Sequence, residues 1–116
     1  NIETEVGTMR AGENVSLPDD FPSDVYIING KIISSFSEKT LGSQVVQIVA
    51  DKNLEEIKEL YIEKLTEEGW NNVGDYSQQD MLSIAFAKNG INLTVSAGEE
   101  DEQMIVTIML VKPITY

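Results

Sequence analysis

Between Asn53 and Trp70 apolar residues recur at steps of three and four, a pattern that predicts one amphipathic helix over about residues 54–68. Asn53 can cap its first turn, and Glu56 can reach back to the Asn53 amide. Gly69 favours a left-handed ending after which Trp70 can fold back onto the helix. Charged residues fall outside the apolar stripe. The stripe consists of Leu54, Ile57, Leu60, Tyr61 and Leu65.

The rest of the chain has the short apolar runs and turn residues of β-strands. Asn29-Gly30 and Asn89-Gly90 each lie between two such runs and predict tight hairpin turns. The prolines and aspartates of residues 17–25 predict an extended, turn-rich segment. Strands are predicted over residues 31–37, 43–50, 70–77, 81–88, 91–97 and 103–111.

Two of these strands, 43–50 and 103–111, carry apolar residues on both faces, which is typical of central strands or of strands whose second face is covered. One helix can cover only one face of a sheet. We therefore expect Phe21–Ile28, or another chain, to provide further cover.

The predicted fold class is α+β: an antiparallel sheet of about five strands with one helix on one face, in the order β-β-α-β-β-β(-β). Residues 1–16 show no sustained period and predict a flexible tail or linker, followed by a single domain over 17–116.

Composition narrows the possible functions. The 116 residues are 41% hydrophobic and 24% charged, with a net charge of −12 and neither cysteine nor histidine. The charge disfavours nucleic acid and anionic lipid, and the two absences remove the commonest nucleophile, general base and metal ligands. We expect no enzyme activity, cofactor or resident metal. A chain beginning at Asn1 suggests a processed or excised product, so we expect membrane attachment only through an anchor outside this chain.

One set of motifs resembles a group of poorly characterised bacterial secreted or lipid-anchored proteins. The residues concerned are Leu-Pro-Asp-Asp-Phe-Pro-Ser-Asp-Val from Leu17, then Gly30-Lys31, then a helix with Leu60-Tyr61 that closes at Gly69-Trp70. Members of the group carry a pattern like D-F-P-x-D-V-P-x-Y-P-G-A-K and a helix of the type F/Y-Y-x-x-x-L-x-x-x-G-W. Here Ile27-Ile28-Asn29 replaces the proline-containing part. The resemblance implies an extracytoplasmic location, at the cell envelope or secreted, and no known activity.

Acidic residues suggest two candidate cation sites. Glu99, Glu100, Asp101 and Glu102, near Asp80, can offer oxygens to calcium, but a solvated hairpin tip is the favoured explanation, because the spaced ligands and central glycine of an EF-hand loop are missing. The second candidate consists of Asp19, Asp20 and Asp24, which turn formation beside the prolines explains just as well.

Aromatic residues suggest a groove for a sugar or a peptide. Tyr61, Trp70 and Tyr76 are the candidates, and the alternative is that the first two are core anchors of the helix. Asn14-Val15-Ser16 and Asn92-Leu93-Thr94 match the glycosylation pattern, which is common by chance.

Two functional hypotheses follow. The first is a non-enzymatic envelope domain that binds a protein or peptide, or a second copy of itself, by strand addition at a sheet edge or through the second apolar face. Ile105, Met109 and Val111 are the residues expected on that face. The alternative is a small-ligand or cation-binding accessory domain that uses the acidic turn.

Overall fold

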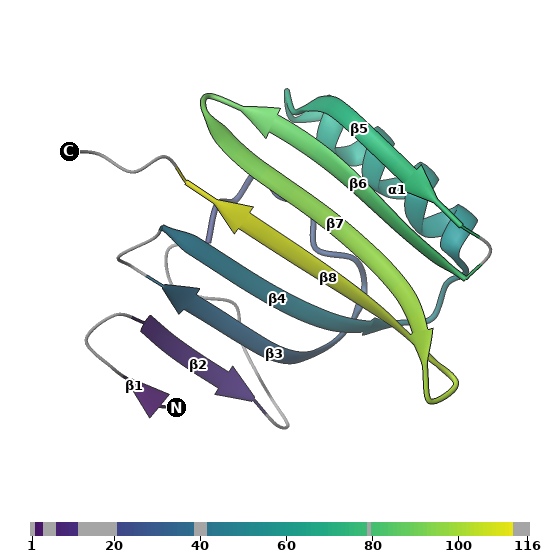
Figure 1. Ribbon diagram of the computed structural model, residues 1–116, viewed down its shortest axis with the longest axis horizontal. Helices are drawn as coiled ribbons and strands as arrows, with labels where there is room; N and C mark the ends of the chain where they lie inside the picture. The colour runs from purple at the N-terminus through teal and green to yellow at the C-terminus, as the bar shows by residue number, and fades with distance from the viewer. Residues whose placement is uncertain (1, 4–6, 12–20, 39–41, 79, 113–116) are drawn as a thin grey trace.

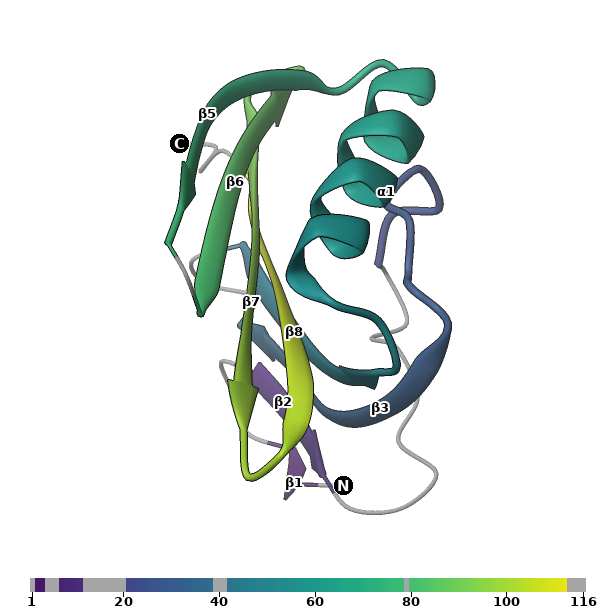
Figure 2. The same cartoon turned by 90° about the vertical axis from the view of Figure 1, so that its right-hand side faces the viewer.

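The computed structural model describes residues 2–3, 7–11, 21–38, 42–78 and 80–112. Within these residues one antiparallel sheet carries a single helix on one face (Figures 1 and 2), which confirms the predicted α+β class. The strand order across the sheet is β1-β2-β3-β4-β8-β7-β6-β5. The elements are β1 (Ile2–Glu3), β2 (Gly7–Ala11), β3 (Gly30–Glu38), β4 (Ser43–Ala50), α1 (Leu54–Glu67), β5 (Asn71–Ser77), β6 (Met81–Lys88), β7 (Ile91–Glu100) and β8 (Gln103–Val111).

The sheet has more strands than the predicted sheet of about five. β3 to β8 correspond to the six segments in which the sequence predicted strands. β1 and β2 lie within residues 1–16, for which it predicted a tail or linker. β2 pairs with the edge of β3, with Thr8 opposite Ser37. This pairing gives the backbone groups along one side of β3 hydrogen-bonding partners that they would otherwise take from water.

Both ends of α1 form as the sequence predicted. The Asn53 side chain accepts a hydrogen bond from the Glu56 amide at 2.9 Å, and the Glu56 carboxylate accepts one from the Asn53 amide at 3.3 Å, which completes a capping box. At the other end Gly69 has a φ of +93°, and the Trp70 amide donates to the Leu65 carbonyl at 2.9 Å. These contacts form a Schellman ending, with the helix closing one residue earlier than predicted.

The core lies between α1 and one face of the sheet, which we call the inner face. Ile57, Tyr61 and Leu65 of α1 are fully buried against it. The four strands β4, β8, β7 and β6 each contribute three alternating buried hydrophobic residues, as expected for strands with one covered side. These residues are Val46, Ile48, Ala50, Val106, Ile108, Leu110, Leu93, Val95, Ala97, Leu82, Ile84 and Phe86.

The segment Phe21–Ile28 packs on this same inner face, beside α1, where it extends the cover toward β3 and β4 (Figure 2). Val25 and Ile28 are buried in the core. The Ile28 amide donates to the Tyr61 hydroxyl at 3.1 Å, so this backbone group is satisfied by the helix and not by a strand. Phe21–Ile28 therefore packs over the sheet, but on the face that α1 already covers, so the expectation that it covers the second face is wrong.

The hairpin predicted at Asn29-Gly30 is wrong, because residues 26–28 form no strand and Gly30 is itself the first residue of β3. Glycine is needed there for a different reason: a Cβ atom on Gly30 would lie 2.2 Å from the Val49 carbonyl oxygen. The second Asn-Gly pair behaves as predicted, since Asn89 and Gly90 both have positive φ and join β6 to β7.

The two strands with apolar residues on both faces, β4 and β8, pair with each other at the centre of the sheet. Their central position agrees with the prediction. β8 reaches this place because β5 to β8 form a meander whose last strand pairs with β4, so that strands distant in sequence meet in the middle (Figure 1).

Candidate functional site

The face of the sheet opposite α1 is turned toward the viewer in Figure 1, and among the described residues no segment lies over it. Cross-strand pairing places four residues of each of the strands β4, β8, β7 and β6 on it, sixteen in all. We call these sixteen residues the open face. They are Ser43, Val45, Gln47, Val49, Ile105, Thr107, Met109, Val111, Asn92, Thr94, Ser96, Gly98, Met81, Ser83, Ala85 and Ala87.

The three residues predicted for the second apolar face all lie here, on β8. Met109 and Val111 are 44% and 37% exposed, and Ile105 is half-buried. Val45 of β4 is the register partner of Met109, and Phe36 of β3, which is 37% exposed, continues the same row. An exposed apolar row across three strands is the kind of surface that soluble proteins use for contacts.

A polar row runs parallel to this apolar row. Gln47 pairs in register with Thr107, which pairs with Ser96. The Ser34 hydroxyl donates to Gln47 Oε1 at 2.9 Å, and Gln47 Nε2 donates to the Thr107 hydroxyl at 3.4 Å. The amide of Gln47 is thus hydrogen-bonded at both ends by its neighbours on the sheet.

None of the sixteen residues of the open face is charged, whereas the adjoining strand β3 carries an exposed Lys31 on the same side, in register with Val49. At the chain-wide frequency of 24%, about four of its sixteen positions would be charged, and exposed surfaces usually exceed the average. The −12 net charge is therefore carried by other surfaces of the molecule. Depletion of charge together with exposed Met residues, here Met81 and Met109, is typical of the core of a protein interface.

The acidic turn predicted at Glu99–Glu102 lies at the tip of the β7–β8 hairpin. Asp101 and Glu102 are its two central residues, with φ values of +51° and +64°, and all four side chains are exposed. Among the described residues no group of three or more acidic side chains is placed to hold one metal ion. The geometry is that of a solvated two-residue turn.

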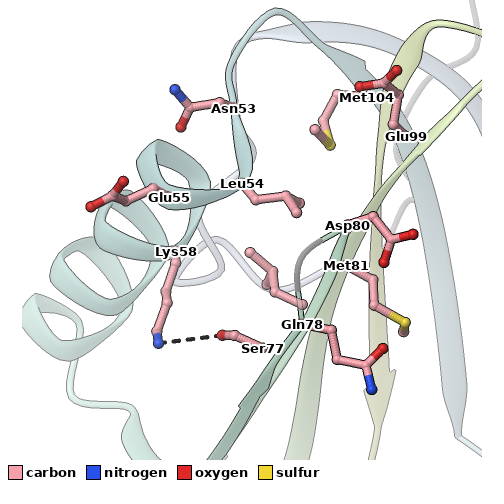
Figure 3. Close-up of a pocket in the computed structure, with 11 residues that line it drawn as sticks. Asn53, Leu54, Glu55, Lys58, Ser77, Gln78, Asp80, Met81, Glu99 and Met104 are labelled. Carbon is pink, nitrogen blue, oxygen red and sulfur yellow. Dashed lines mark hydrogen bonds between the residues drawn. The ribbon is translucent and has the colours of Figure 1, made fainter.

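An open hollow of about 810 Å³ lies between the beginning of α1 and the ends of β6, β7 and β8 (Figure 3). It brings Asp80 and Glu99 to one side, as the sequence suggested, while Leu54 and Met104 form apolar parts of its wall. Lys58 donates to the Ser77 hydroxyl at 3.4 Å and lies 3.7 Å from Asp75, so its ammonium group is already engaged. The hollow is wide open and most of its lining side chains are polar, unlike the enclosed and mainly apolar pockets that small ligands occupy.

Of the three aspartates proposed as a second cation site, Asp24 is described, and Asp19 and Asp20 lie outside the described residues. The Asp24 carboxylate pairs with Lys88 at 2.6 Å, and Lys88 also donates to the Glu68 carbonyl at 2.6 Å. Lys88 therefore ties the segment Phe21–Ile28 to the end of α1. This contact has a structural role that a bound cation would disrupt.

The three candidate aromatic residues do not form a groove. Tyr61 is fully buried, and burial raises the pKa of its hydroxyl well above the usual range. Trp70 is 2% exposed and donates from Nε1 to the Asp24 carbonyl at 3.1 Å. Tyr76 is 55% exposed on the edge strand β5. Tyr61 and Trp70 are thus the core anchors that the sequence offered as the alternative.

Of the two glycosylation patterns, residues 14–16 lie outside the described residues and Asn92 is an exposed residue of β7.

Sequence reasoning missed the polar row at Gln47 and did not name Val45, or Phe36 of the adjoining strand β3, as neighbours of Met109. A signal for the face exists in the sequence, because alternate residues of four predicted strands lack charge. It becomes visible only when the strands are placed side by side in the correct order.

No family model matches this sequence, and no curated protein or solved structure shows significant similarity to it. Within the described residues no helix is long and apolar enough to cross a membrane.

Proposed function

We propose that this chain is a non-enzymatic module that binds a protein partner through the open face of its sheet. The observation that carries the proposal is the combination of exposed apolar side chains with a complete lack of charge over sixteen contiguous positions. In a chain with a net charge of −12, a face of this kind has a lower cost of dehydration than the charged surfaces around it.

Binding through the face is better supported than strand addition at an edge. β5 is the edge strand on one side, and all seven of its residues are exposed. Its ladder to β6 is interrupted between Asn72 and Gly74, and Asp75 lies in the strand. A bulge and a charged residue are two devices by which natural sheets discourage edge pairing.

We also propose an extracytoplasmic location for the domain, at the cell envelope or secreted. The support for this location is the residue pattern Asp20-Phe21-Pro22 with Gly69-Trp70, which resembles secreted and lipid-anchored bacterial proteins. Fractionation of cells that make the protein tests the location, because recovery in the cytosolic fraction alone would contradict it.

Site-specific photo-crosslinking tests the open face as a binding surface. A photoreactive amino acid at Met109 lies on the face, whereas the same amino acid at Val73, which is 62% exposed on β5, lies outside it. In cells that make the protein we expect heavier adducts from position 109 and few from position 73. Equal adduct yields at the two positions, or none at Met109, would contradict the proposal.

A further inference from the structure

We infer that the strand pair β1–β2 is an autoinhibitory element, which keeps the edge of β3 from pairing with β3 of a second copy of this chain. The inference does not depend on the proposed function, because it concerns an edge of the sheet and not the open face. Its support comes from the attachment of the strand pair, the sequence of the β3 edge and the contrast with the opposite edge of the sheet.

The strand pair β1–β2 lies at one margin of the sheet and is attached along a single line (Figure 1). Of the described helices and strands, β1 contacts β2 alone, and β2 contacts only β1 and β3. The five residues of β2 align with residues 34–38 of β3. Ordering each residue costs about 1–2 kcal/mol of backbone entropy, whereas each hydrogen bond returns a net of about 0.5–1.5 kcal/mol. Because these backbone terms nearly cancel, β2 can leave β3 at a small cost.

The strand β3 keeps its place when β2 leaves. Its other side pairs with β4 from Gly30 to Glu38, and Ile32 packs against the core. The edge that β2 covers is therefore preorganised. When the incoming strand also belongs to a folded sheet, neither strand has to lose backbone entropy on pairing.

The β3 edge lacks most of the features by which natural sheets discourage edge-to-edge pairing. Residues 34–37 are Ser-Ser-Phe-Ser, without a charge or a proline, and Glu38 is the last residue of the paired stretch. The bulge of β3 lies between Ile32 and Ser34, at the margin of the stretch that β2 covers. By contrast, the opposite edge strand β5 has both a bulge and Asp75 within it. The sheet thus protects one edge by the sequence of the strand itself and the other edge by β2.

A second copy of β3 is the strand that fits the uncovered edge. Two identical strands can pair in antiparallel fashion about a two-fold axis perpendicular to the sheet, and such an isologous contact closes as a dimer. The β5 edge of another copy is a poor partner because of its bulge and its charge. In the β3–β3 dimer the two sheets become continuous and both open faces lie on the same side. Phe36, which continues the apolar row of the open face, lies near the junction.

The intact chain favours β2 over a second copy because β2 is tethered. A tethered strand competes at an effective concentration in the millimolar range, whereas a second copy has only its own concentration. Association of two copies also loses translational and rotational freedom, at a cost of about 4–15 kcal/mol. We therefore expect the β3 edge to stay covered in the intact chain and to support a dimer once the pairing of β2 is broken.

Two proline substitutions in the full chain test the inference. Adjacent amides of a strand point to opposite sides, so Thr8→Pro/Met9→Pro removes one amide that faces β3. Ile2→Pro/Glu3→Pro is the matched control, because β1 pairs with β2 and not with β3. In sedimentation over a concentration series we expect the first variant to dimerise at least tenfold more tightly than the wild type, and the control to match the wild type. A folded Thr8→Pro/Met9→Pro chain, checked by circular dichroism, that associates no more than the wild type would overturn the inference.

Lysine substitutions in the Thr8→Pro/Met9→Pro background identify the surface through which the copies meet. Phe36→Lys places a charge on the β3 edge, and Met109→Lys places one on the open face, two strands away. We expect Phe36→Lys to return the chain to a monomer and Met109→Lys to leave the dimer in place. Persistence of the dimer with Phe36→Lys, or its loss with Met109→Lys, would show that another surface is used and would overturn the inference. Cross-linking at Met109 of the intact chain tests the proposed function separately, since there β2 covers the edge.

Discussion

Replacing Tyr61 with phenylalanine tests how the segment Phe21–Ile28 is held on the inner face. The Tyr61 hydroxyl accepts a hydrogen bond from the Ile28 amide at 3.1 Å, and Ile28 is 1% exposed. In the variant this amide loses its acceptor in a place that water cannot easily reach. The aromatic ring and its packing are retained, so the change removes little besides one oxygen atom.

The expected cost follows from the burial of the amide. A buried donor that loses its partner costs about 1–3 kcal/mol, part of which is regained because the Tyr61 hydroxyl no longer has to be buried. We expect a net loss of about 1–2 kcal/mol in the free energy of unfolding. With an unfolding entropy of about 2.1 cal/mol/K per residue, a chain of this length should show a fall in Tm of about 4–8 °C.

Urea unfolding followed by circular dichroism measures this loss, and Tyr26→Phe is the matched control. Tyr26 packs edge-on against Tyr61, with ring centroids 5.4 Å apart, and the same oxygen is removed from a half-buried ring. We expect the control to change stability by less than about 0.5 kcal/mol. If Tyr61→Phe is as stable as the wild type, or if the two variants lose the same stability, the role assigned to this hydrogen bond is wrong.

Three further predictions concern stability. Burial raises the pKa of Tyr61, so the folded state keeps a proton that the unfolded state releases above about pH 10. The free energy of unfolding should therefore fall as the pH rises past about 10, and urea titration should show a larger fall in the wild type than in Tyr61→Phe. Gly30→Ala should cost about 1–3 kcal/mol because its Cβ would meet the Val49 carbonyl oxygen, whereas Gly74→Ala, with no atom within 4 Å of the added Cβ, should change little; equal losses would refute the close contact. Asn53→Ala removes the helix cap and should cost about 1 kcal/mol in the same assay, and an unchanged midpoint would show that the capping box contributes nothing.

Local structure could be predicted from the sequence wherever residues close together in the chain interact with one another. The capping box at Asn53 and the Schellman ending at Gly69 depend on residues a few positions apart, and both formed as predicted. The Asn89-Gly90 turn did so as well. Asn29-Gly30 failed as a predictor because Gly30 is required by the close approach of Val49, a residue of another strand. A glycine needed for a long-range contact has the same appearance in a sequence as a glycine needed for a turn.

The candidate site could be predicted from the sequence only in part, for a related reason. Alternation along β8 was enough to place Ile105, Met109 and Val111 on one face. The neighbours of these residues, Phe36 and Val45, lie at least 60 positions earlier in the sequence, and no local pattern links them to β8.

The sequence by itself determined the helix with both of its ends, the six main strands and the two-sided apolar character of β4 and β8, because propensity, period and capping act over a few residues. The tertiary structure alone decided which face Phe21–Ile28 covers and how the strands are ordered. Both depend on contacts between distant segments, such as Ile28 with Tyr61 and Lys88 with Asp24. Because these contacts draw all the described cover to one side of the sheet, the side that carries the open face is left uncovered.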